Sequence, residues 1–389
     1  MKWTRLKSVA VVLLLLSTFL FFALPKIVDR FLNTVHLAST VPLKRKTDEV
    51  ERKVFTADMH ADTLLWNREL ANSNKHGHID LPRMLKANVG LQIFSAVTKT
   101  PRHLNFERND AKTDNITLLA IMQRWPIRTW DSRIERALYQ AERLHGVSQH
   151  SNGQLVVIRS GRDLSDYLMR RSNGAKITAA MLAIEGLHAL DGDINNLDRL
   201  HAAGYRMMGL THFFDNEIGG SAHGVNKTGL TELGYQVVEK MERLGIIIDL
   251  AHGSEALISD VAAVAKRPLV ISHTGVKGTC DRTRNLSDEQ LKMIADTGGL
   301  VGIAYFPEAI CSTKINGIAA AIRYTANVIG VRYTALGSDF DGAVSTPIDI
   351  TGLPLLVEAL EQEGFSREEI AAIMGGNIVR LLKQNLHLD

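Results

Sequence analysis

Cysteine is scarce in this chain, which has only Cys280 and Cys311 among its 389 residues. The two residues do not form the Cys-x-x-Cys spacing of zinc ribbons or thiol oxidoreductases. A metal site in this protein would therefore have to be built from histidine and carboxylate side chains.

The chain also lacks a strong excess of either charge. It carries 45 Lys and Arg against 42 Asp and Glu, a formal net charge of +3. No basic stripe with interleaved aromatic residues is visible, so we expect no nucleic-acid partner. No Gly-x-Gly-x-x-Gly follows a predicted strand, which argues against a dinucleotide-binding fold.

One long apolar run is present at the N-terminus. Lys2, Arg5 and Lys7 precede an uncharged run from Ser8 to Pro25, which is long enough to span a bilayer. No small-x-small cleavage site follows it, so we interpret residues 1–25 as a membrane anchor rather than as a cleaved signal peptide, which is the alternative.

The basic residues before this run should stay in the cytoplasm, which places the rest of the chain outside it. We therefore expect a membrane-anchored protein whose main domain is extracytoplasmic, facing the periplasm from a bacterial inner membrane. Residues 26–52 are charged and mixed in character and are predicted to form a linker or stalk. Residues 53–389 are predicted to form the main domain.

The main domain contains eight short apolar runs, most of them separated by segments with helical apolar spacing. Short apolar runs of this kind are typical of buried parallel strands. Eight such strands alternating with helices predict a (β/α)₈ TIM-type barrel, with a long and mostly helical insertion over residues 108–166. The runs are Val54–Ala57, Val89–Ala96, Ile177–Ile184, Tyr205–Leu210, Ile246–Leu250, Leu269–Ile271, Leu300–Tyr305 and Tyr333–Leu336.

Six of these eight runs end in His, Asp or Glu. In TIM barrels the active site lies at the C-terminal ends of the strands. A doubly wound sheet is the alternative architecture, but it would not concentrate polar residues at so many strand ends.

The fifth and sixth runs show this most clearly, because His252 follows one and His273 follows the other, with a predicted helix between them. A right-handed crossover brings the ends of neighbouring parallel strands to the same edge of the sheet. Two neutral imidazoles at one edge make a ready metal pair. The alternative is two separate buried histidines, each with its own hydrogen bond.

The other strand ends add more metal-binding side chains than one tetrahedral zinc with an open position would need. Two metal ions bridged by one carboxylate would use them all, at the usual separation of about 3.5–4 Å. Two such ions lower the pKa of a shared water and polarise a bound carbonyl. These side chains are His60, Asp62, Glu185, His212, Asp339 and Asp341.

Two further roles would complete hydrolysis of a peptide bond. A carboxylate beside the metals could carry a proton to the leaving amine, and an arginine could hold a substrate carboxylate through paired hydrogen bonds. Arg282 and Arg284 follow the sixth strand and are available for the second role.

The order of these motifs resembles that of the membrane (renal) dipeptidase family, zinc dipeptidases of the metal-dependent hydrolase superfamily. The similarity extends from about Val54 to the C-terminal helix. It rests on D-M-H-A-D, A-I-E-G-L-H, G-L-T-H, R-L-G-I-I-I-D-L-A-H, V-I-S-H-T-G, R-N-L-S-D-E and G-S-D-F-D-G, in this order.

The resemblance implies a role for each strand-end residue. His60 and Asp62 would bind one zinc ion, His252 and His273 the other, and Glu185 would bridge the two. His212 would bind the scissile carbonyl and stabilise the tetrahedral intermediate. Arg284 would hold the terminal carboxylate of a dipeptide, and Asp339 would act as the proton shuttle.

The resemblance further implies hydrolysis of free dipeptides, including those with a C-terminal D-residue. It implies a disulfide between Cys280 and Cys311. We expect His188 and Asp341 to support the ligands from behind, and Asp215, Glu217 and His223 to shape specificity or simply to line a polar loop. The remaining histidines, His76, His78, His145 and His150 among them, are predicted to lie at the surface.

Two other functions stay open at this stage. One is a different amide or lactone hydrolase on the same scaffold, and the other is a catalytically inactive membrane-tethered binding protein. The sequence does not decide the oligomeric state, and a homodimer stays open.

Overall fold

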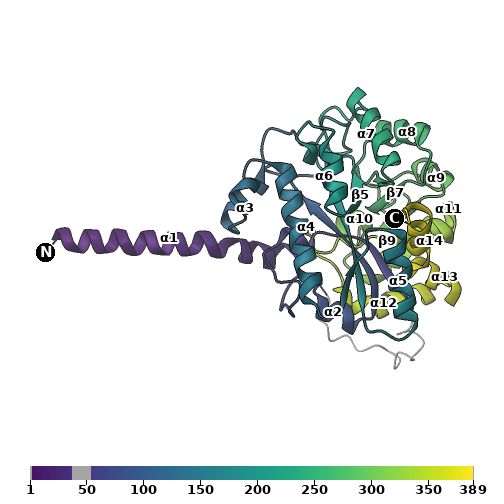
Figure 1. The fold of residues 1–389 in the computed structure, drawn as a ribbon, viewed down its shortest axis with the longest axis horizontal. Helices are drawn as coiled ribbons and strands as arrows, with labels where there is room; N and C mark the ends of the chain where they lie inside the picture. Colours follow the sequence, from purple (N-terminus) through teal and green to yellow (C-terminus); the bar gives the residue numbers. More distant parts are fainter. Residues whose placement is uncertain (1, 37–53, 389) are drawn as a thin grey trace.

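A computed structural model describes residues 2–36 and 54–388 of the chain (Figure 1). Most of the predicted linker therefore lies outside the described residues. In the described part, strands curl into a barrel with helices around it, and one long helix extends away from this body.

The barrel is built from parallel strands in the order β1-β2-β4-β5-β6-β7-β8-β9. Its ends meet where the backbone N–H of Asp62 donates to the carbonyl of Phe340 at 2.8 Å. This arrangement confirms the predicted TIM-type barrel. The strands are β1 (Thr56–Ala61), β2 (Val89–Val97), β4 (Thr178–Glu185), β5 (Tyr205–Gly209), β6 (Ile247–Asp249), β7 (Val270–Thr274), β8 (Leu300–Ile303) and β9 (Thr334–Leu336).

A further strand, β3 (Leu155–Val157), was not predicted. It lies in the insertion after β2 and pairs with the outer part of β4, off the main path of the barrel. Its sequence, Leu155-Val156-Val157, is a short apolar run, but it lies inside a segment predicted to be mostly helical, and two of its three residues are only partly buried. Pairing with a distant strand, rather than local pattern, makes this segment extended.

Helices surround the barrel, and several begin at a capping side chain. Ser366 and Glu369 form a capping box at the start of α13, which satisfies backbone N–H groups that the helix itself cannot. The main helices are α2 (Leu81–Lys86), α3 (Asn115–Met122), α4 (Arg133–His150), α5 (Gly161–Ser172), α6 (Asn196–Ala202), α7 (Glu232–Arg243), α8 (Glu255–Val264), α9 (Asp288–Asp296), α10 (Pro307–Ile310), α11 (Ile315–Ile329), α12 (Leu353–Gln362), α13 (Arg367–Ala371) and α14 (Asn377–Asn385).

The barrel interior is packed with side chains from alternate positions along each strand. In β4 these are Ala179, Met181 and Ala183, all buried in one cluster with residues of the other strands. Because side chains of a strand alternate between its two faces, Glu185 at the end of β4 continues this inward row. The hydrophobic packing of the barrel thus aims a carboxylate into its C-terminal mouth.

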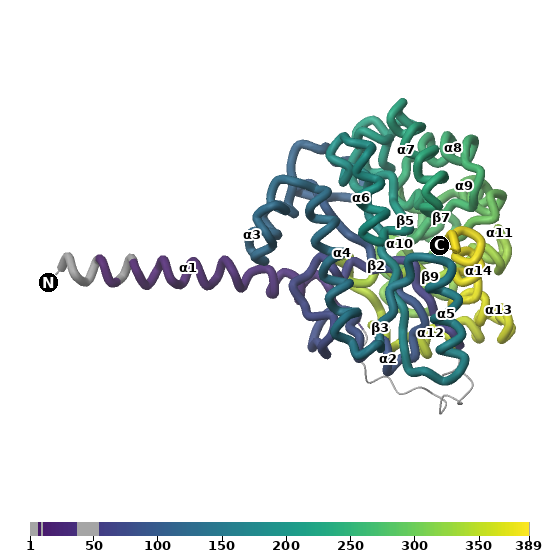
Figure 2. Tube along the Cα trace, in the orientation of Figure 1, coloured from purple at the N-terminus to yellow at the C-terminus, as the bar shows by residue number. Residues whose placement is uncertain are grey.

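The N-terminal helix α1 (Lys2–Leu32) includes a stretch, Val11–Leu32, long and apolar enough to cross a membrane. The helix does not end at Pro25 but continues through it. Its last turns lie against the barrel, where Asp29 pairs with Arg68 at 2.8 Å (Figure 2). The first part of the predicted linker is therefore helical and packed on the main domain.

The disulfide that the resemblance implies is present between Cys280 and Cys311, with Cα atoms 5.4 Å apart. It ties the loop after β7 to the end of α10. Asn285 in the same loop donates to the carbonyls of Cys280 and Ala309 at 2.6 and 2.8 Å. These bonds hold the loop that carries Arg284 against the rim of the barrel.

Candidate metal and active site

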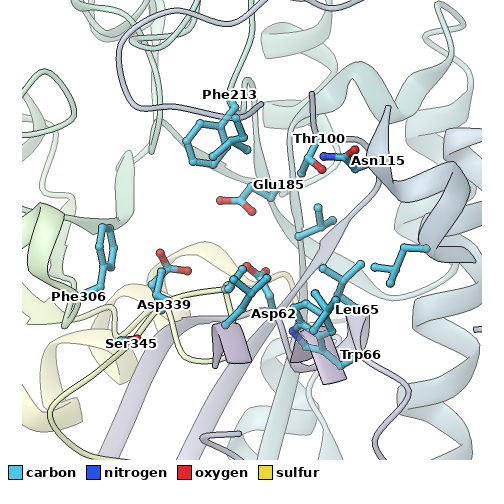
Figure 3. Close-up of a pocket in the computed structure, with 18 of the residues that line it drawn as sticks. Asp62, Leu65, Trp66, Thr100, Asn115, Glu185, Phe213, Phe306, Asp339 and Ser345 are labelled. Carbon is cyan, nitrogen blue, oxygen red and sulfur yellow. The ribbon is translucent and has the colours of Figure 1, made fainter. Parts of the chain in front are cut away.

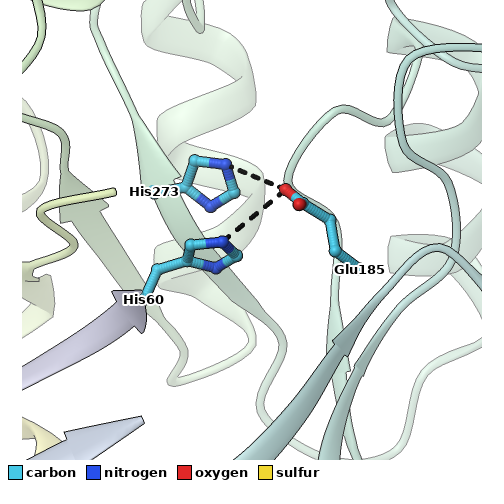
Figure 4. A group of neighbouring side chains, drawn as sticks. All are labelled: His60, Glu185 and His273. Carbon is cyan, nitrogen blue, oxygen red and sulfur yellow. Dashed lines mark ion pairs between the residues drawn. The ribbon is translucent and has the colours of Figure 1, made fainter. Parts of the chain in front are cut away.

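The carboxylate of Glu185 lies at the centre of a ring of histidines at the barrel mouth. Its Oε1 atom is 3.3 Å from Nε2 of His273 and 3.6 Å from Nε2 of His60 (Figure 4). The same atom is 2.9 Å from Nε2 of His252. Its other oxygen, Oε2, is 3.2 Å from Nε2 of His212. One carboxylate therefore faces imidazoles from four different strand ends.

In each of the two predicted ligand pairs, the two side chains lie next to each other. Nε2 of His60 lies 3.4 Å from Oδ1 of Asp62, and Nε2 of His252 lies 3.0 Å from Nε2 of His273. All these side chains are buried, although their origins in the sequence span more than two hundred positions. The topology of the barrel brings them together because each follows the C-terminal end of a strand.

The backbone is irregular where these residues occur. The register of β1 shifts between Asp58 and Ala61, and that of β7 shifts between Ile271 and Thr274. Irregularities of this kind re-aim side chains beside active sites. His252 adopts a left-handed backbone conformation, with φ of 63°, which is unfavourable for a residue with a Cβ atom and recurs at functional sites.

Burial and the neighbouring charges shift the pKa values of the side chains in this cluster. Burial alone would raise the pKa of Glu185, but His212, His60 and His273 together hold it below its ordinary value. Burial lowers the pKa of His252 and His273 well below the ordinary value, so both imidazoles are neutral. Burial also lowers the pKa of His60, but Asp62 and Glu185 outweigh it and raise that pKa to about 10. The carboxylates of the cluster thus favour a positive charge on His60.

The residues present fit divalent metal ions. Donor atoms within 4.8 Å of one another occur in three overlapping groups, and Glu185 belongs to two of them. Two buried atoms that face this space, Nε2 of His60 and Oδ1 of Asp62, form no hydrogen bond within the described part of the chain. Neutral imidazole nitrogens and carboxylate oxygens are the donors that zinc and similar ions prefer.

Asp339 lies beside this cluster in the loop after β9. It is buried and has a φ of 61°, so it too is held in the left-handed region. Burial raises the pKa of Asp339 well above its ordinary value, against the lowering effect of His60, and the neighbouring Asp62 raises it further. Its carboxyl group joins His60 and Asp62 in the third group of donors.

Arg284 is buried at the other side of the cluster. Its Nη1 donates to the carbonyl of His273 at 3.0 Å, and its guanidinium lies 5.1 Å from the ring centroid of Phe306. Its Nε has no hydrogen-bond partner in the described part of the chain. A buried guanidinium with an unused N–H favours an anionic partner such as a carboxylate. Its neighbour Arg282 is exposed.

His212 is buried with its Nδ1 unpaired within the described residues. Burial lowers the pKa of His212, although Glu185 opposes this effect, so the ring is neutral near pH 7. A neutral imidazole next to the cluster can donate one hydrogen bond to an oxygen that gains negative charge.

Three residues that support this cluster were missed by the sequence analysis. Ser272 Oγ lies 2.9 Å from Nδ1 of His273 and 3.3 Å from Nδ1 of His60. Asp58 accepts from the backbone of His60 and Ser338, and Asp249 accepts from the backbone of Ser272 at 2.9 Å. The signal was available, because each is a polar residue inside an otherwise apolar strand.

The two residues predicted to support the ligands, His188 and Asp341, are both buried. His188 lies 3.0 Å from Thr98 Oγ1 through its Nε2, and its ring centroid is 4.9 Å from that of Phe214. Asp341 pairs with Arg68 at 2.7 Å and accepts from Thr63 Oγ1 at 2.7 Å. Asp341 therefore links the loop of Asp339 to Arg68 and to Thr63, the residue that follows Asp62.

One expectation about the remaining histidines was wrong. His78 is fully buried, donates its backbone N–H to Asp341 at 2.7 Å and stacks on Phe340. Its predicted surface position failed because its partner is 263 positions away in the sequence. His150 is exposed, whereas His76 and His145 are partly buried.

In the polar loop after β5, Asp215 holds the backbone of the loop itself. Asp215 accepts from the backbone of Ser221 and Asn226 at 2.9 and 2.7 Å, and Glu217 is exposed. His223 is buried, and its ring centroid lies 5.2 Å from that of His252. Of Asp215, Glu217 and His223, only His223 lies next to one of the proposed metal ligands, His252.

The donors open into a pocket of about 890 Å³. Figure 3 shows the carboxylates of Glu185, Asp62 and Asp339 facing this space, with Phe306 on one side and Leu65 and Trp66 on the other. The pocket is thus polar around the cluster and mainly apolar beyond it.

Comparisons with known proteins agree with this geometry. The model of the membrane dipeptidase family, peptidase family M19, matches residues 44–388. Dipeptidase aclJ of Aspergillus oryzae is 29% identical over 99% of this chain and 90% of its own length. Dipeptidase 3 of Homo sapiens is 27% identical, over 79% of this chain and 64% of its own length.

Two solved structures share the fold. A metallo peptidase from Rhodobacter sphaeroides, liganded with a phosphinate mimic of the dipeptide L-Ala-D-Ala, has a TM-score of 0.69 and 24% identity, covering 85% of this chain and 99% of that chain. The probable dipeptidase PvdM from Pseudomonas aeruginosa has a TM-score of 0.72 and 19% identity, covering 86% of this chain and 96% of that chain.

The position of Ser272 generates a prediction about metal affinity. We expect Ser272→Ala to weaken metal binding about tenfold to a hundredfold, because its hydroxyl orients the rings of His60 and His273. Titration against a competing chelator measures this. Ser165→Ala, which removes a hydroxyl bonded within α5, is the matched control. Unchanged affinity in the Ser272 variant would show that the hydroxyl does not orient the ligands.

Proposed function

We propose, from the premise that this chain belongs to the membrane dipeptidase family (peptidase family M19), that it hydrolyses free dipeptides with two bound divalent metal ions. The observation that carries this proposal is the single carboxylate of Glu185, which lies within 3.6 Å of His60, His252 and His273. Such an arrangement suits a carboxylate shared by two ions.

His60 and Asp62 would hold one ion, His252 and His273 the other, and Glu185 both. We propose zinc as the metal, because the donors are imidazole nitrogens and carboxylate oxygens, with no thiolate among them. When bound, such ions lower the pKa of a water and polarise a carbonyl, which makes peptide hydrolysis accessible near neutral pH.

Asp339 would carry the proton in this reaction. Its buried carboxyl group lies beside Asp62 and His60, and burial keeps its pKa well above the ordinary value of a carboxyl group. A raised pKa makes the carboxylate form of Asp339 a stronger base, which could take a proton from water, and the acid form that results could pass this proton to the nitrogen that leaves. His212 would donate a hydrogen bond from its neutral ring to the oxygen that gains charge on the carbonyl.

Arg284 would set the length of the substrate. It lies beside His252, with Nη2 3.5 Å from Nε2 of that histidine. A terminal carboxylate held at Arg284 leaves room for only one residue after the scissile bond, which selects dipeptides. The phosphinate mimic of L-Ala-D-Ala in the Rhodobacter sphaeroides relative supports extending the proposal to dipeptides with a C-terminal D-residue.

We further propose that α1 anchors the enzyme in a bacterial inner membrane, with the barrel in the periplasm. The basic residues before the apolar run favour this orientation. The disulfide between Cys280 and Cys311 fits an oxidising compartment outside the cytoplasm.

A turnover assay with metal analysis tests the proposed function. The full chain in detergent or nanodiscs should hydrolyse members of a panel of L,L- and L,D-dipeptides, lose this activity in a chelator and regain it with zinc. Metal analysis should give two ions per chain. Failure to hydrolyse any dipeptide while two zinc ions are bound would overturn the proposal, and hydrolysis of N-acyl amides or lactones instead would assign a different reaction to the site.

Asp339 provides a second test. We expect Asp339→Asn to keep both metal ions and to lower kcat by about a hundredfold to ten-thousandfold, because the proton carrier is removed. Metal analysis and steady-state kinetics on one preparation measure both quantities. Asp281→Asn, at an exposed position near Arg284, is the control. Loss of a metal ion from the Asp339 variant would instead make Asp339 a ligand.

Arg284 provides a third test. We expect Arg284→Ala to raise KM for free dipeptides by about tenfold to a hundredfold, because a hydrogen-bonded charge pair is lost. C-terminally amidated dipeptides lack this carboxylate and should be affected much less. Arg282→Ala, at the exposed neighbouring arginine, is the matched control. Equal effects on acids and amides would remove Arg284 from the proposed role.

A further inference from the structure

The end of the N-terminal helix lines the same pocket as the proposed catalytic groups. Leu24, Pro25, Val28, Phe31 and Leu32 of α1 border it, together with Glu185, His212, Arg284 and Asp339 of the barrel. The helix that contains the apolar membrane-length stretch is therefore also a wall of the candidate active site. The uncharged run ends at Pro25, so this wall begins where that run ends.

Buried polar contacts hold this part of α1 in place. Asp29 is 2% exposed and pairs with Nε of Arg68 at 2.8 Å. Arg68 in turn pairs with Asp341 at 2.7 Å, and the backbone N–H of Ala343 donates to Asn33 at 2.9 Å. Asp341 and Ala343 belong to the loop that also carries Asp339. Burying these charges is costly unless they stay paired, so the helix end and the catalytic loop are held together.

The part of the pocket next to α1 is apolar. Val28 packs on a buried cluster that includes Leu65, Trp66, Val97 and Ile116, and these four residues line the pocket as well. Arg284 and Phe306 lie at the opposite side (Figure 3 shows Phe306 across from Leu65 and Trp66). A dipeptide whose carboxylate is held at Arg284 would thus direct its amino-terminal residue toward α1.

The size of the pocket also favours a substrate with a large side chain. Its volume of about 890 Å³ lies near the upper end of the range of roughly 300–1,000 Å³ that holds drug-sized ligands. A dipeptide of two small residues would leave the apolar part empty or wet, which favours a substrate that fills it.

We propose that the C-terminal end of α1 is part of the substrate-binding site, and that the preferred substrate is a dipeptide with a large apolar side chain on its amino-terminal residue. This inference rests on the proposed dipeptidase function and adds a substrate class to it. Val28 and Leu24 are then specificity-determining residues contributed by the anchor helix.

The test compares Trp–Ala with Ala–Ala as substrates of the full, zinc-loaded chain in nanodiscs. We expect kcat/KM to favour Trp–Ala by about tenfold or more, the discrimination that an apolar pocket commonly provides. Val28→Trp and Leu24→Trp should each lower this ratio by about tenfold, because the new ring fills the space that the substrate side chain needs. Two variants are used because Val28 is packed, whereas Leu24 is 45% exposed and tolerates substitution.

Val12→Trp is the matched control. Val12 lies in the same helix, is 61% exposed and is about 24 Å from Val28 along the axis, so the ratio should not change. A wild-type ratio of one or less, an unchanged ratio in both pocket variants, or a purified chain that begins after residue 36 would overturn the inference while leaving dipeptidase activity in place. Absence of any dipeptide hydrolysis would remove the proposed function and this inference with it.

Discussion

Burial of several carboxylates and imidazoles with too few fixed cations is the constraint on which the rest of the structure depends. Asp62, Glu185 and Asp339 are each less than 8% exposed at the barrel mouth, and Arg284 is a nearby fixed cation. Leaving such charges unpaired away from water is very unfavourable. The cluster therefore favours positive charge, and its imidazole nitrogens and carboxylate oxygens are donors that fit a metal ion.

Residues outside the cluster hold its side chains in position. Parallel strands with a fully packed interior hold the donor backbones in place, and irregular register in β1 and β7 turns His60 and His273 into the mouth. His252 and Asp339 are kept in left-handed conformations that only well-packed surroundings can maintain. Ser272, Asp58 and Asp249 then fix the rings and backbones from behind.

The same loop that carries Asp339 also connects the barrel to α1, through Asp341 and Arg68. The end of α1, the loop of Asp339 and the wall of the pocket are consequently packed together as one unit. The helix that the sequence predicts as a membrane anchor thus also lines the pocket with its C-terminal end. The disulfide at the opposite rim secures the loop of Arg284 in a comparable way.

The sequence by itself determined the barrel and the identity of the clustered side chains. Strands that are buried on both faces appear in the sequence as apolar runs. Because the strands are parallel, His252, His273 and the polar residues at the other strand ends lie at the same edge of the sheet. Only the tertiary structure decided that β3 pairs with β4, that His78 is buried against Asp341, that Ser272 supports two imidazoles and that α1 continues into the pocket. Each of these depends on partners far apart in the chain, as with the 263 positions between His78 and Asp341, and local pattern carries no information about such partners.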